Sequence, residues 1–191
     1  KMDRTNARTM AMFRRIGIAE RVRALGYPPD VPMDVFFVTR ICDPPLATLR
    51  YPSVAAYREL IAASNDGTLP LEPYQLVSQN DLEPLLVEVA RETPNVTVRF
   101  GCELVGFEQD DAGVTVHTGS RVGAREDVRS AYLVGTDGGA STVRKSLGIE
   151  LSGRGGISSQ VQVIFGSDDL FDKIPIGKGR HYNFTDDSVR T

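Results

Sequence analysis

Residues 132–148 read YLVGTDGGASTVRKSLG, and they carry the clearest structural signal in the sequence. The pattern predicts a buried strand, a turn through Asp137 and Gly138, and a helix that Ser141 caps. In open α/β sheets, ligands bind in the crevice beyond the carboxyl ends of the strands. There the carboxylate of Asp137 can accept hydrogen bonds from ribose hydroxyls, and Arg144 can meet phosphate. The same residues also fit a plain strand-to-helix turn whose Asp-Gly pair serves its geometry, and the local pattern leaves both interpretations open.

Helices and strands alternate along the rest of the chain. Apolar residues at helical spacing predict helices over residues 6–16 and 19–25 and from Asn80 onward, whereas residues 55–64 are ambiguous. A hairpin is predicted around residues 110–113. Alternation and turn residues predict strands over residues 33–40, 46–50, 96–100, 103–108, 114–118, 128–135 and 160–165. We therefore expect an α/β fold in which a nucleotide-binding core carries antiparallel β insertions.

Composition excludes several classes of function. Hydrophobic residues make up 41% and charged residues 25% of the 191 residues, which fits a globular protein with a sizeable core. The net charge of -3 gives no support for nucleic-acid binding, and no apolar run is long enough to span a membrane. Cys42 and Cys102 match no metal or redox spacing, and no zinc-peptidase, Walker A or serine-hydrolase motif occurs. We expect a reduced, cytoplasmic protein without a metal site.

Three further features bear on function. Residues 1–25 hold seven basic and two acidic side chains, which fits either a phosphate-binding site or a solvated helix face. His117 and His181 are expected to be ordinary residues of strands. The chain opens on Lys1 and stops at Thr191 without a capping signal, so we interpret it as a fragment of a longer polypeptide.

Three ordered motifs resemble one family. Residues 3–17, DRTNARTMAMFRRIG, look like a segment with an arginine, then Asn-Ala-Arg-Thr-Met, and a helix that ends in glycine. Residues 75–86, QLVSQNDLEPLL, resemble a segment that carries a flavin-contacting glutamine before a long helix. Residues 136–144, TDGGASTVR, resemble an Asp-Gly motif. In order and spacing these motifs are similar to those of the class A flavoprotein monooxygenases, the aromatic-ring hydroxylases typified by para-hydroxybenzoate hydroxylase.

The resemblance implies a role in FAD binding for five residues. Arg4 would reach the phosphates or a ribose of FAD, with Arg8 beside it. Gln79 would hydrogen-bond near the flavin from the loop ahead of the helix. Asp137 would bind the ribityl or ribose part, and Gly138 would let the cofactor approach the backbone closely.

The resemblance also implies the reaction. NAD(P)H, for whose phosphate Arg144 is the candidate residue, would reduce the flavin. A flavin C4a-hydroperoxide formed with molecular oxygen would then hydroxylate a small phenolic or related aromatic substrate. Because the flavin supplies this chemistry, no side chain is assigned as a catalytic acid or base. Packing in the core is the commoner role of aromatic residues, but the candidates for the substrate pocket are Phe36, Phe37, Tyr51, Phe165 and Tyr182.

Other functions stay open at this point. An epoxidase, a reductase or a halogenase would share the same flavin fold, and a binding module that has lost its cofactor would keep the scaffold. The G-x-G-x-x-G turn and the later Gly-Asp motif of the family are absent from these 191 residues, so we expect the fragment alone to bind FAD poorly and to be inactive.

The motifs also suggest a division of the chain. We expect a partial Rossmann-like FAD-binding domain over residues 1–26 and 75–150, a substrate-domain insertion over residues 27–74, and the start of a β-rich substrate domain over residues 151–191. The sequence predicts no oligomeric state.

Overall fold

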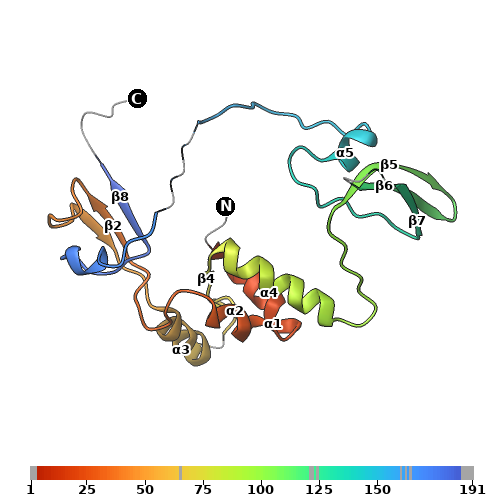
Figure 1. Cartoon of the computed structure of the whole chain (residues 1–191). Helices are drawn as coiled ribbons and strands as arrows, with labels where there is room; N and C mark the ends of the chain where they lie inside the picture. The colour runs from red at the N-terminus through yellow and green to blue at the C-terminus, as the bar shows by residue number, and fades with distance from the viewer. Residues whose placement is uncertain are drawn as a thin grey trace. The chain divides into compact units, whose positions relative to one another are not determined.

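The computed structural model describes residues 4–64, 66–120, 123, 125–159, 161, 163 and 165–185. The chain divides into two compact units: unit 1 contains residues 1–96 and 164–191, and unit 2 contains residues 97–163. Both helices and sheets occur, as the predicted α/β class requires (Figure 1).

The described residues of unit 1 form four α-helices and one short 3-10 helix. The α-helices are α1 (Ala7–Arg15), α2 (Ala19–Ala24), α3 (Val54–Ser64) and α4 (Gln79–Glu92), and the 3-10 helix spans Phe171–Lys173. The predicted helices are thus confirmed, and the ambiguous segment 55–64 is helical. Asn6 and Ser78 cap α1 and α4, because their side-chain oxygens accept hydrogen bonds from the amides of Thr9 and Asn80, respectively.

The described part of unit 1 also contains two small sheets. Strand β1 (Arg4–Thr5) pairs antiparallel with β4 (Gln75–Leu76). In the second sheet, β2 (Val35–Val38) lies between β3 (Ala47–Leu49), which is antiparallel to it, and β8 (His181–Phe184), which is parallel to it. The predicted strands at 33–40 and 46–50 are confirmed with shorter ends, and His181 lies on a strand as expected.

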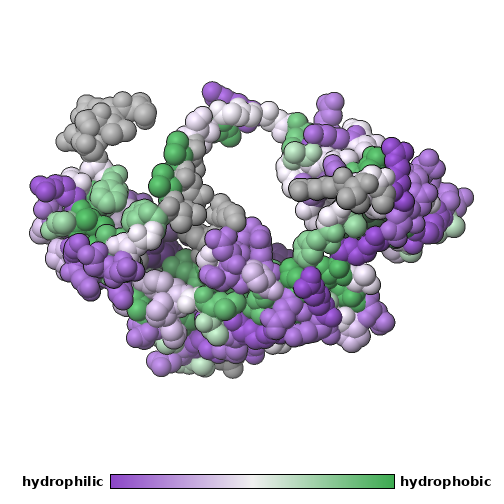
Figure 2. All heavy atoms as spheres, in the orientation of Figure 1, coloured by the Kyte–Doolittle hydropathy of each residue, from purple (hydrophilic) through white to green (hydrophobic). Residues whose placement is uncertain are grey.

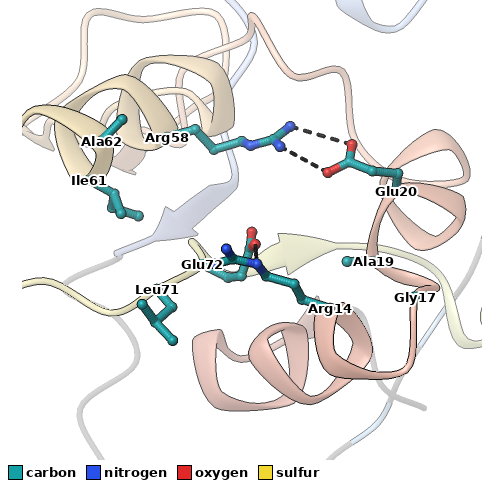
Figure 3. A pocket seen from close by; sticks show the side chains of 9 residues that line it. All are labelled: Arg14, Gly17, Ala19, Glu20, Arg58, Ile61, Ala62, Leu71 and Glu72. Carbon is teal, nitrogen blue, oxygen red and sulfur yellow. Dashed lines mark hydrogen bonds and ion pairs between the residues drawn. The ribbon is translucent and has the colours of Figure 1, made fainter. Parts of the chain in front are cut away.

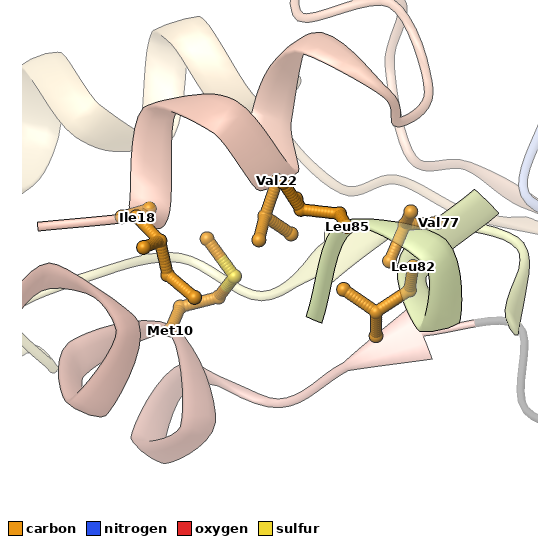
Figure 4. Close-up of a cluster of buried hydrophobic side chains, with 7 residues drawn as sticks. Met10, Ile18, Val22, Val77, Leu82 and Leu85 are labelled. Atoms are coloured by element: carbon orange, nitrogen blue, oxygen red, sulfur yellow. The ribbon is translucent and has the colours of Figure 1, made fainter. Parts of the chain in front are cut away.

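The core of unit 1 joins the helices α1, α2 and α4. Its buried side chains converge in Figure 4: Met10, Ile18, Val22, Val77, Leu82 and Leu85, with Ala19 beside them. Burying one such large side chain stabilises a fold by about 1.5–3 kcal/mol, so the cluster stabilises the packing of these helices. It thereby fixes the start of α1 and the start of α4, which follow the two paired strands β1 and β4.

Unit 2 is built on an antiparallel sheet. Strands β5 (Cys102–Asp110), β6 (Gly113–Ser120) and β7 (Arg125–Ser130) follow one another in that order, and the turn between β5 and β6 is the predicted hairpin. The visible face of this sheet is mainly hydrophilic (Figure 2). Helix α5 (Thr142–Ser146) follows, and Ser141 caps it as predicted by accepting a hydrogen bond from the amide of Arg144 at 3.0 Å.

Three predicted strands differ from the structure. The strand expected over 128–135 ends at Ser130, and residues 132–138 are extended without strand pairing. Tyr132 and Val134 are 85% and 78% exposed, so the expected burial of this stretch is wrong. Burial needs partner strands and covering helices, and the described residues supply neither here. Residues 96–100 likewise form no strand, nor do 161, 163 and 165, while residues 160, 162 and 164 of that prediction lie outside the described part.

Candidate functional site

The pairing of β1 with β4 brings two of the three motifs together. Arg4 lies opposite Leu76, and Thr5 lies opposite Gln75, to whose carbonyl oxygen the Thr5 hydroxyl donates at 3.3 Å. Gln75 is buried, and its side-chain amide donates to the carbonyl oxygens of Leu76 at 3.0 Å and Tyr27 at 3.3 Å. These bonds hold the strand that leads into α4 against the strand that carries Arg4.

Arg4 and Arg8 lie in different surroundings. Arg4 lines a cavity of about 550 Å³, which we call the tyrosine cavity because Tyr51, Tyr57 and Tyr74 contribute to its walls. Arg8 is exposed on α1 and is not among the described residues that line this cavity. The structure therefore distinguishes the two arginines that the first motif offers: one faces a cavity and the other faces solvent.

Gln79 is the first residue of α4. Its side-chain amide donates a hydrogen bond to the carboxylate of Glu83, one helical turn later. Its position follows from the cap at Ser78 and from the pairing of Leu76 with Arg4. The resemblance places this glutamine in the loop ahead of the helix, whereas in the structure it is the first helical residue and Ser78 is the cap.

Asp137 in unit 2 organises the Asp-Gly turn. One carboxylate oxygen accepts from the Ser141 hydroxyl at 2.5 Å, and the other accepts from the amides of Thr142 at 2.6 Å and Val143 at 3.3 Å. The hydrogen bond from Ser141 is the main reason why the pKa of Asp137 lies below its ordinary value. A carboxylate offers about four acceptor positions, so Asp137 can still accept one further hydrogen bond.

Gly138 and Arg144 shape the same turn. Gly138 has φ of 78°, a left-handed conformation that favours glycine, and its Cα faces open space. Arg144 donates from Nη1 to the carbonyl oxygen of Ile149 at 2.6 Å and from Nη2 to that of Gly139 at 3.4 Å. These bonds hold the guanidinium against the turn that Asp137 caps. The contacts of Asp137 and Arg144 therefore stabilise the turn itself. The turn also places a carboxylate, a glycine and a cation beside one another.

The six predicted residues divide between the two units. Arg4, Arg8 and Gln79 belong to unit 1, whereas Asp137, Gly138 and Arg144 belong to unit 2. The structure brings Arg4 and the segment before Gln79 together, and it brings the three residues of the Asp-Gly turn together.

The tyrosine cavity contains a residue that sequence reasoning missed. The guanidinium of Arg180 lies 5.1 Å from the ring centroid of Tyr51 and 5.5 Å from that of Tyr74, and its Nη1 donates to the Tyr74 hydroxyl at 2.8 Å. Nothing in the sequence marks Arg180, because its neighbours in the cavity come from residues far away along the chain. Of the predicted pocket aromatics, Tyr51 lines this cavity, whereas Phe165 is 72% exposed.

Two other predicted aromatics pack in the sheet of unit 1. Phe36 is buried on β2 and stacks on Tyr182 of β8, with ring centroids 5.4 Å apart. Tyr182 also lines a second cavity of about 500 Å³ beside Tyr27 and Ile174. Burial raises the pKa of Tyr182 and, with the nearby Tyr182 hydroxyl, the pKa of Tyr27. Phe36 therefore belongs to the core, as the alternative interpretation allowed.

A further cavity in unit 1 is lined by paired charges (Figure 3). Arg58 donates to Glu20 at 2.9 Å, and Arg14 lies 3.7 Å from Glu72. Because each arginine here has a carboxylate partner, these charges compensate one another, and we interpret the contacts as structural. We call this cavity the paired-charge cavity.

The described residues offer neither a metal site nor a membrane span. The described part of the chain contains no cluster of three or more histidine, cysteine, aspartate or glutamate residues that could hold a metal ion. Among the same residues, no helix combines the length and the apolar character needed to cross a bilayer.

His117 lies on β6, where its Nδ1 is 2.8 Å from the carboxylate of Asp127. That hydrogen bond raises the pKa of His117.

The comparisons with known proteins agree with the motifs. The chain matches the FAD binding domain family over residues 1–183. It is 39% identical to the FAD-dependent monooxygenase opdD of Penicillium oxalicum, over 88% of this chain and 33% of that protein. It is 35% identical to the aklavinone 12-hydroxylase RdmE of Streptomyces purpurascens, over 85% of this chain and 30% of that protein. The chain thus spans about a third of the length of these relatives.

Solved structures give the same assignment. The flavin-dependent monooxygenase PieE, in complex with FAD and substrate, is 35% identical and has a TM-score of 0.70 over 82% of this chain and 27% of that one. The ternary complex of aklavinone-11 hydroxylase with FAD and aklavinone is 32% identical, with a TM-score of 0.62 over 78% of this chain and 27% of that one. Because the family match covers nearly all of the sequence and these likenesses agree with it, the chain belongs to the FAD binding domain family, among the class A flavoprotein monooxygenases.

Proposed function

We propose that this chain forms part of the FAD site of a monooxygenase that hydroxylates an aromatic substrate and takes its electrons from NAD(P)H. The observation that carries the proposal is the pairing of β1 with β4, which joins the motif of Arg4 to the motif of Gln79. Relatives named as FAD-dependent monooxygenases and aklavinone hydroxylases support the same reaction class. A Rossmann-like FAD domain over residues 1–26 and 75–150 is part of the proposal.

The residues present fit FAD. The cofactor combines flat rings with anionic phosphates, and the tyrosine cavity places Arg4 beside aromatic walls. In unit 2, Asp137 keeps capacity for one more hydrogen bond, and the open space at Gly138 lets a ligand approach the backbone. Bound FAD would supply the redox chemistry and oxygen activation that no side chain provides.

The protein's own residues would bind and orient the two cofactors. In this proposal Arg4 pairs with a phosphate, Gln79 donates a hydrogen bond near the flavin, and Asp137 accepts one from a ribose or ribityl hydroxyl. Arg144, held over the Asp-Gly turn, offers its charge to the phosphate of NAD(P)H. Arg8, which is exposed on α1 four residues after Arg4, supplies further positive charge.

The test is a cofactor titration followed by turnover. The protein as it occurs in its source is purified, and FAD binding is followed by quenching of flavin fluorescence. We expect stoichiometric FAD, and NAD(P)H oxidation that a phenolic compound accelerates, with a hydroxylated product by mass spectrometry. Arg4→Met should weaken FAD binding at least about tenfold, because a charge-assisted pair is lost, whereas the matched variant Arg15→Met on the exposed end of α1 should not. Failure to bind FAD would reject the proposal.

A further inference from the structure

Arg23, in the last turn of α2, is a buried cation with three polar partners. Its side chain is 8% exposed, and its Nη2 donates to the carboxylate of Glu72, which is equally buried. Its Nη1 donates to Oε1 of Gln75 at 3.2 Å, and its Nε lies 3.7 Å from the exposed carboxylate of Glu20. The planar guanidinium fork therefore bonds two buried side chains at once, which the point charge of a lysine does less well.

The side chain of Gln75 passes these contacts on to the backbone. Its amide donates to the carbonyl oxygens of Tyr27 at 3.3 Å and Leu76 at 3.0 Å, and Leu76 pairs with Arg4 in the sheet of β1 and β4. The space is tight, since a Cβ on Gly26 would clash with the Gln75 amide and lie 2.5 Å from the Leu76 carbonyl oxygen. The chain that leaves α2 thus lies directly against β4.

The segment 27–74 is fastened at both of its ends by this group of residues. At its start, the backbone amide of Tyr27 donates to the carbonyl oxygen of Leu76 at 2.8 Å. Near its end, Glu72 bonds to Arg23. Between these points the segment contributes three tyrosines to the tyrosine cavity, to which β1 contributes an arginine. The contacts of Arg23 therefore help to set where the segment lies relative to β1.

A buried ion pair is a weak source of stability, so its use here points to specificity. The loss of hydration of two charges offsets much of their attraction, and apolar side chains of similar volume are often as stable. Hydrogen bonds, however, require each donor at a defined distance and angle from its acceptor. A shift of segment 27–74 along β4 would separate the Arg23 charge and the Gln75 amide from their partners. These contacts therefore favour a single position of the segment.

We propose that Arg23 is a positioning residue of the FAD site. Through Glu72 and Gln75 it holds β4 in one arrangement. Strand β4 in turn determines where Arg4 on β1 and Gln79 at the start of α4 lie. Arg23 acts through these residues and is assigned no contact with the cofactor. The link to FAD rests on the proposed function, and no covalent step is involved.

The experiment separates position from stability in the protein as it occurs in its source. Arg23→Met leaves the buried Glu72 carboxylate without its main partner, so both the urea midpoint and the affinity for FAD should fall. Arg23→Met combined with Glu72→Met removes that unpaired charge, so the midpoint should recover. Its affinity for FAD should stay at least about tenfold below wild type, because an apolar pair does not fix the arrangement. Arg23→Lys keeps the charge and should retain part of the affinity.

Two measurements report on the site itself. Quenching of flavin fluorescence gives the dissociation constant, and visible circular dichroism reports the surroundings of the bound flavin, which should differ between the double variant and wild type. Arg21→Met is the matched control, because Arg21 lies on the same helix but pairs with Glu88 at 2.9 Å and Glu92 at 3.1 Å in the last turns of α4. It should change the dissociation constant by less than about twofold.

The outcomes distinguish positioning from mere stability. A double variant that regains both its urea midpoint and its affinity for FAD would overturn the proposal, and so would an equal loss of affinity in Arg21→Met. Should the Arg23 variants not fold, wild-type protein decides: FAD must slow hydrogen exchange of the Tyr27 amide and leave that of Thr93, at the end of α4, unchanged. Equal exchange of the Tyr27 amide with and without FAD would then reject the role of Arg23.

Failure of the proposed function gives a different result. Wild-type protein would then bind no FAD, while exchange of the Tyr27 amide would still be faster in the double variant than in wild type, because that amide bonds to the carbonyl oxygen that Gln75 also holds.

Discussion

The backbone carbonyl of Asp34 accepts a hydrogen bond from the backbone amide of Arg180 at 2.7 Å. The carboxylate of the same aspartate accepts from Arg50 Nη1 at 2.6 Å and from the Tyr51 amide at 2.9 Å. Asp34 is 4% exposed and immediately precedes β2. One residue therefore joins the start of β2, the end of β3 and the approach to β8, and it sets the wall of the tyrosine cavity.

Replacing Asp34 by alanine should destabilise the fold. The change removes the partly buried hydrogen bond from the Tyr51 amide, and we expect the free energy of unfolding to fall by about 1–3 kcal/mol. Urea denaturation measures this. Asp43→Ala is the matched control, because the pair of Asp43 with Arg40 is long and exposed, and it should change stability by less than about 1 kcal/mol. Similar losses in both variants would contradict the role of Asp34.

Gly179 should not tolerate a side chain. A Cβ there would lie 2.5 Å from the ring of Phe36 and 2.9 Å from the carbonyl oxygen of Asp34, so β2 and the chain before β8 would have to separate. We expect Gly179→Ala to cost about 1–3 kcal/mol of stability in thermal or urea unfolding. Gly166→Ala, where an added Cβ meets no atom within 4 Å, should be nearly neutral. A neutral Gly179→Ala would show that the two segments do not approach this closely.

Replacing Glu72 by alanine should lower the stability of the fold more than the changes at Asp34 and Gly179. The side chains of Glu72 and Arg23 are each 8% exposed, and Arg23 also donates to Gln75 Oε1 at 3.2 Å. Glu72→Ala leaves the Arg23 charge buried and only partly compensated, so a loss of about 3–5 kcal/mol is expected by chemical denaturation. Because Gln75 belongs to β4, the variant should also weaken FAD binding in the fluorescence titration.

The control for Glu72 is Glu92→Ala. Glu92 pairs with Arg21 at 3.1 Å, but its side chain is 58% exposed, and such a pair contributes less than about 1 kcal/mol. If the two glutamate variants unfold at the same urea concentration, the buried pair is not a determinant of stability.

Acid should release the Asp137 cap. Its pKa is below the ordinary aspartate value of 3.8, chiefly through the hydrogen bond from Ser141, so the cap contributes stability above that value. The contribution is lost as the pH falls through the lowered pKa. We expect the amide resonances of Thr142 and Val143 to titrate below pH 3.8 together with the Asp137 carboxyl signal. Asp137→Asn should remove that titration, and a carboxyl that titrates at or above 3.8 would disprove the cap.

The helix cap and the hairpin could be predicted from the sequence alone. Ser141 was predicted as a helix cap and is one, because a cap depends only on the residues of its own first turn. The hairpin around residues 110–113 was also predicted, because the residues that form a tight turn are neighbours in the sequence. The three motifs sufficed for the family as well, and the match over residues 1–183 confirms it.

Contacts between residues far apart in the chain could not be predicted from the sequence and are known from the structure alone. Burial cannot be derived from an apolar run alone, since Tyr132 lies on such a run and is 85% exposed. The cluster of Arg180 with Tyr51 and Tyr74 has no sequence signal, because it joins three segments through the backbone of Asp34 and the parallel pairing of β2 with β8. Contacts between distant segments depend on how the whole sheet is assembled, and a local pattern holds no information on that assembly.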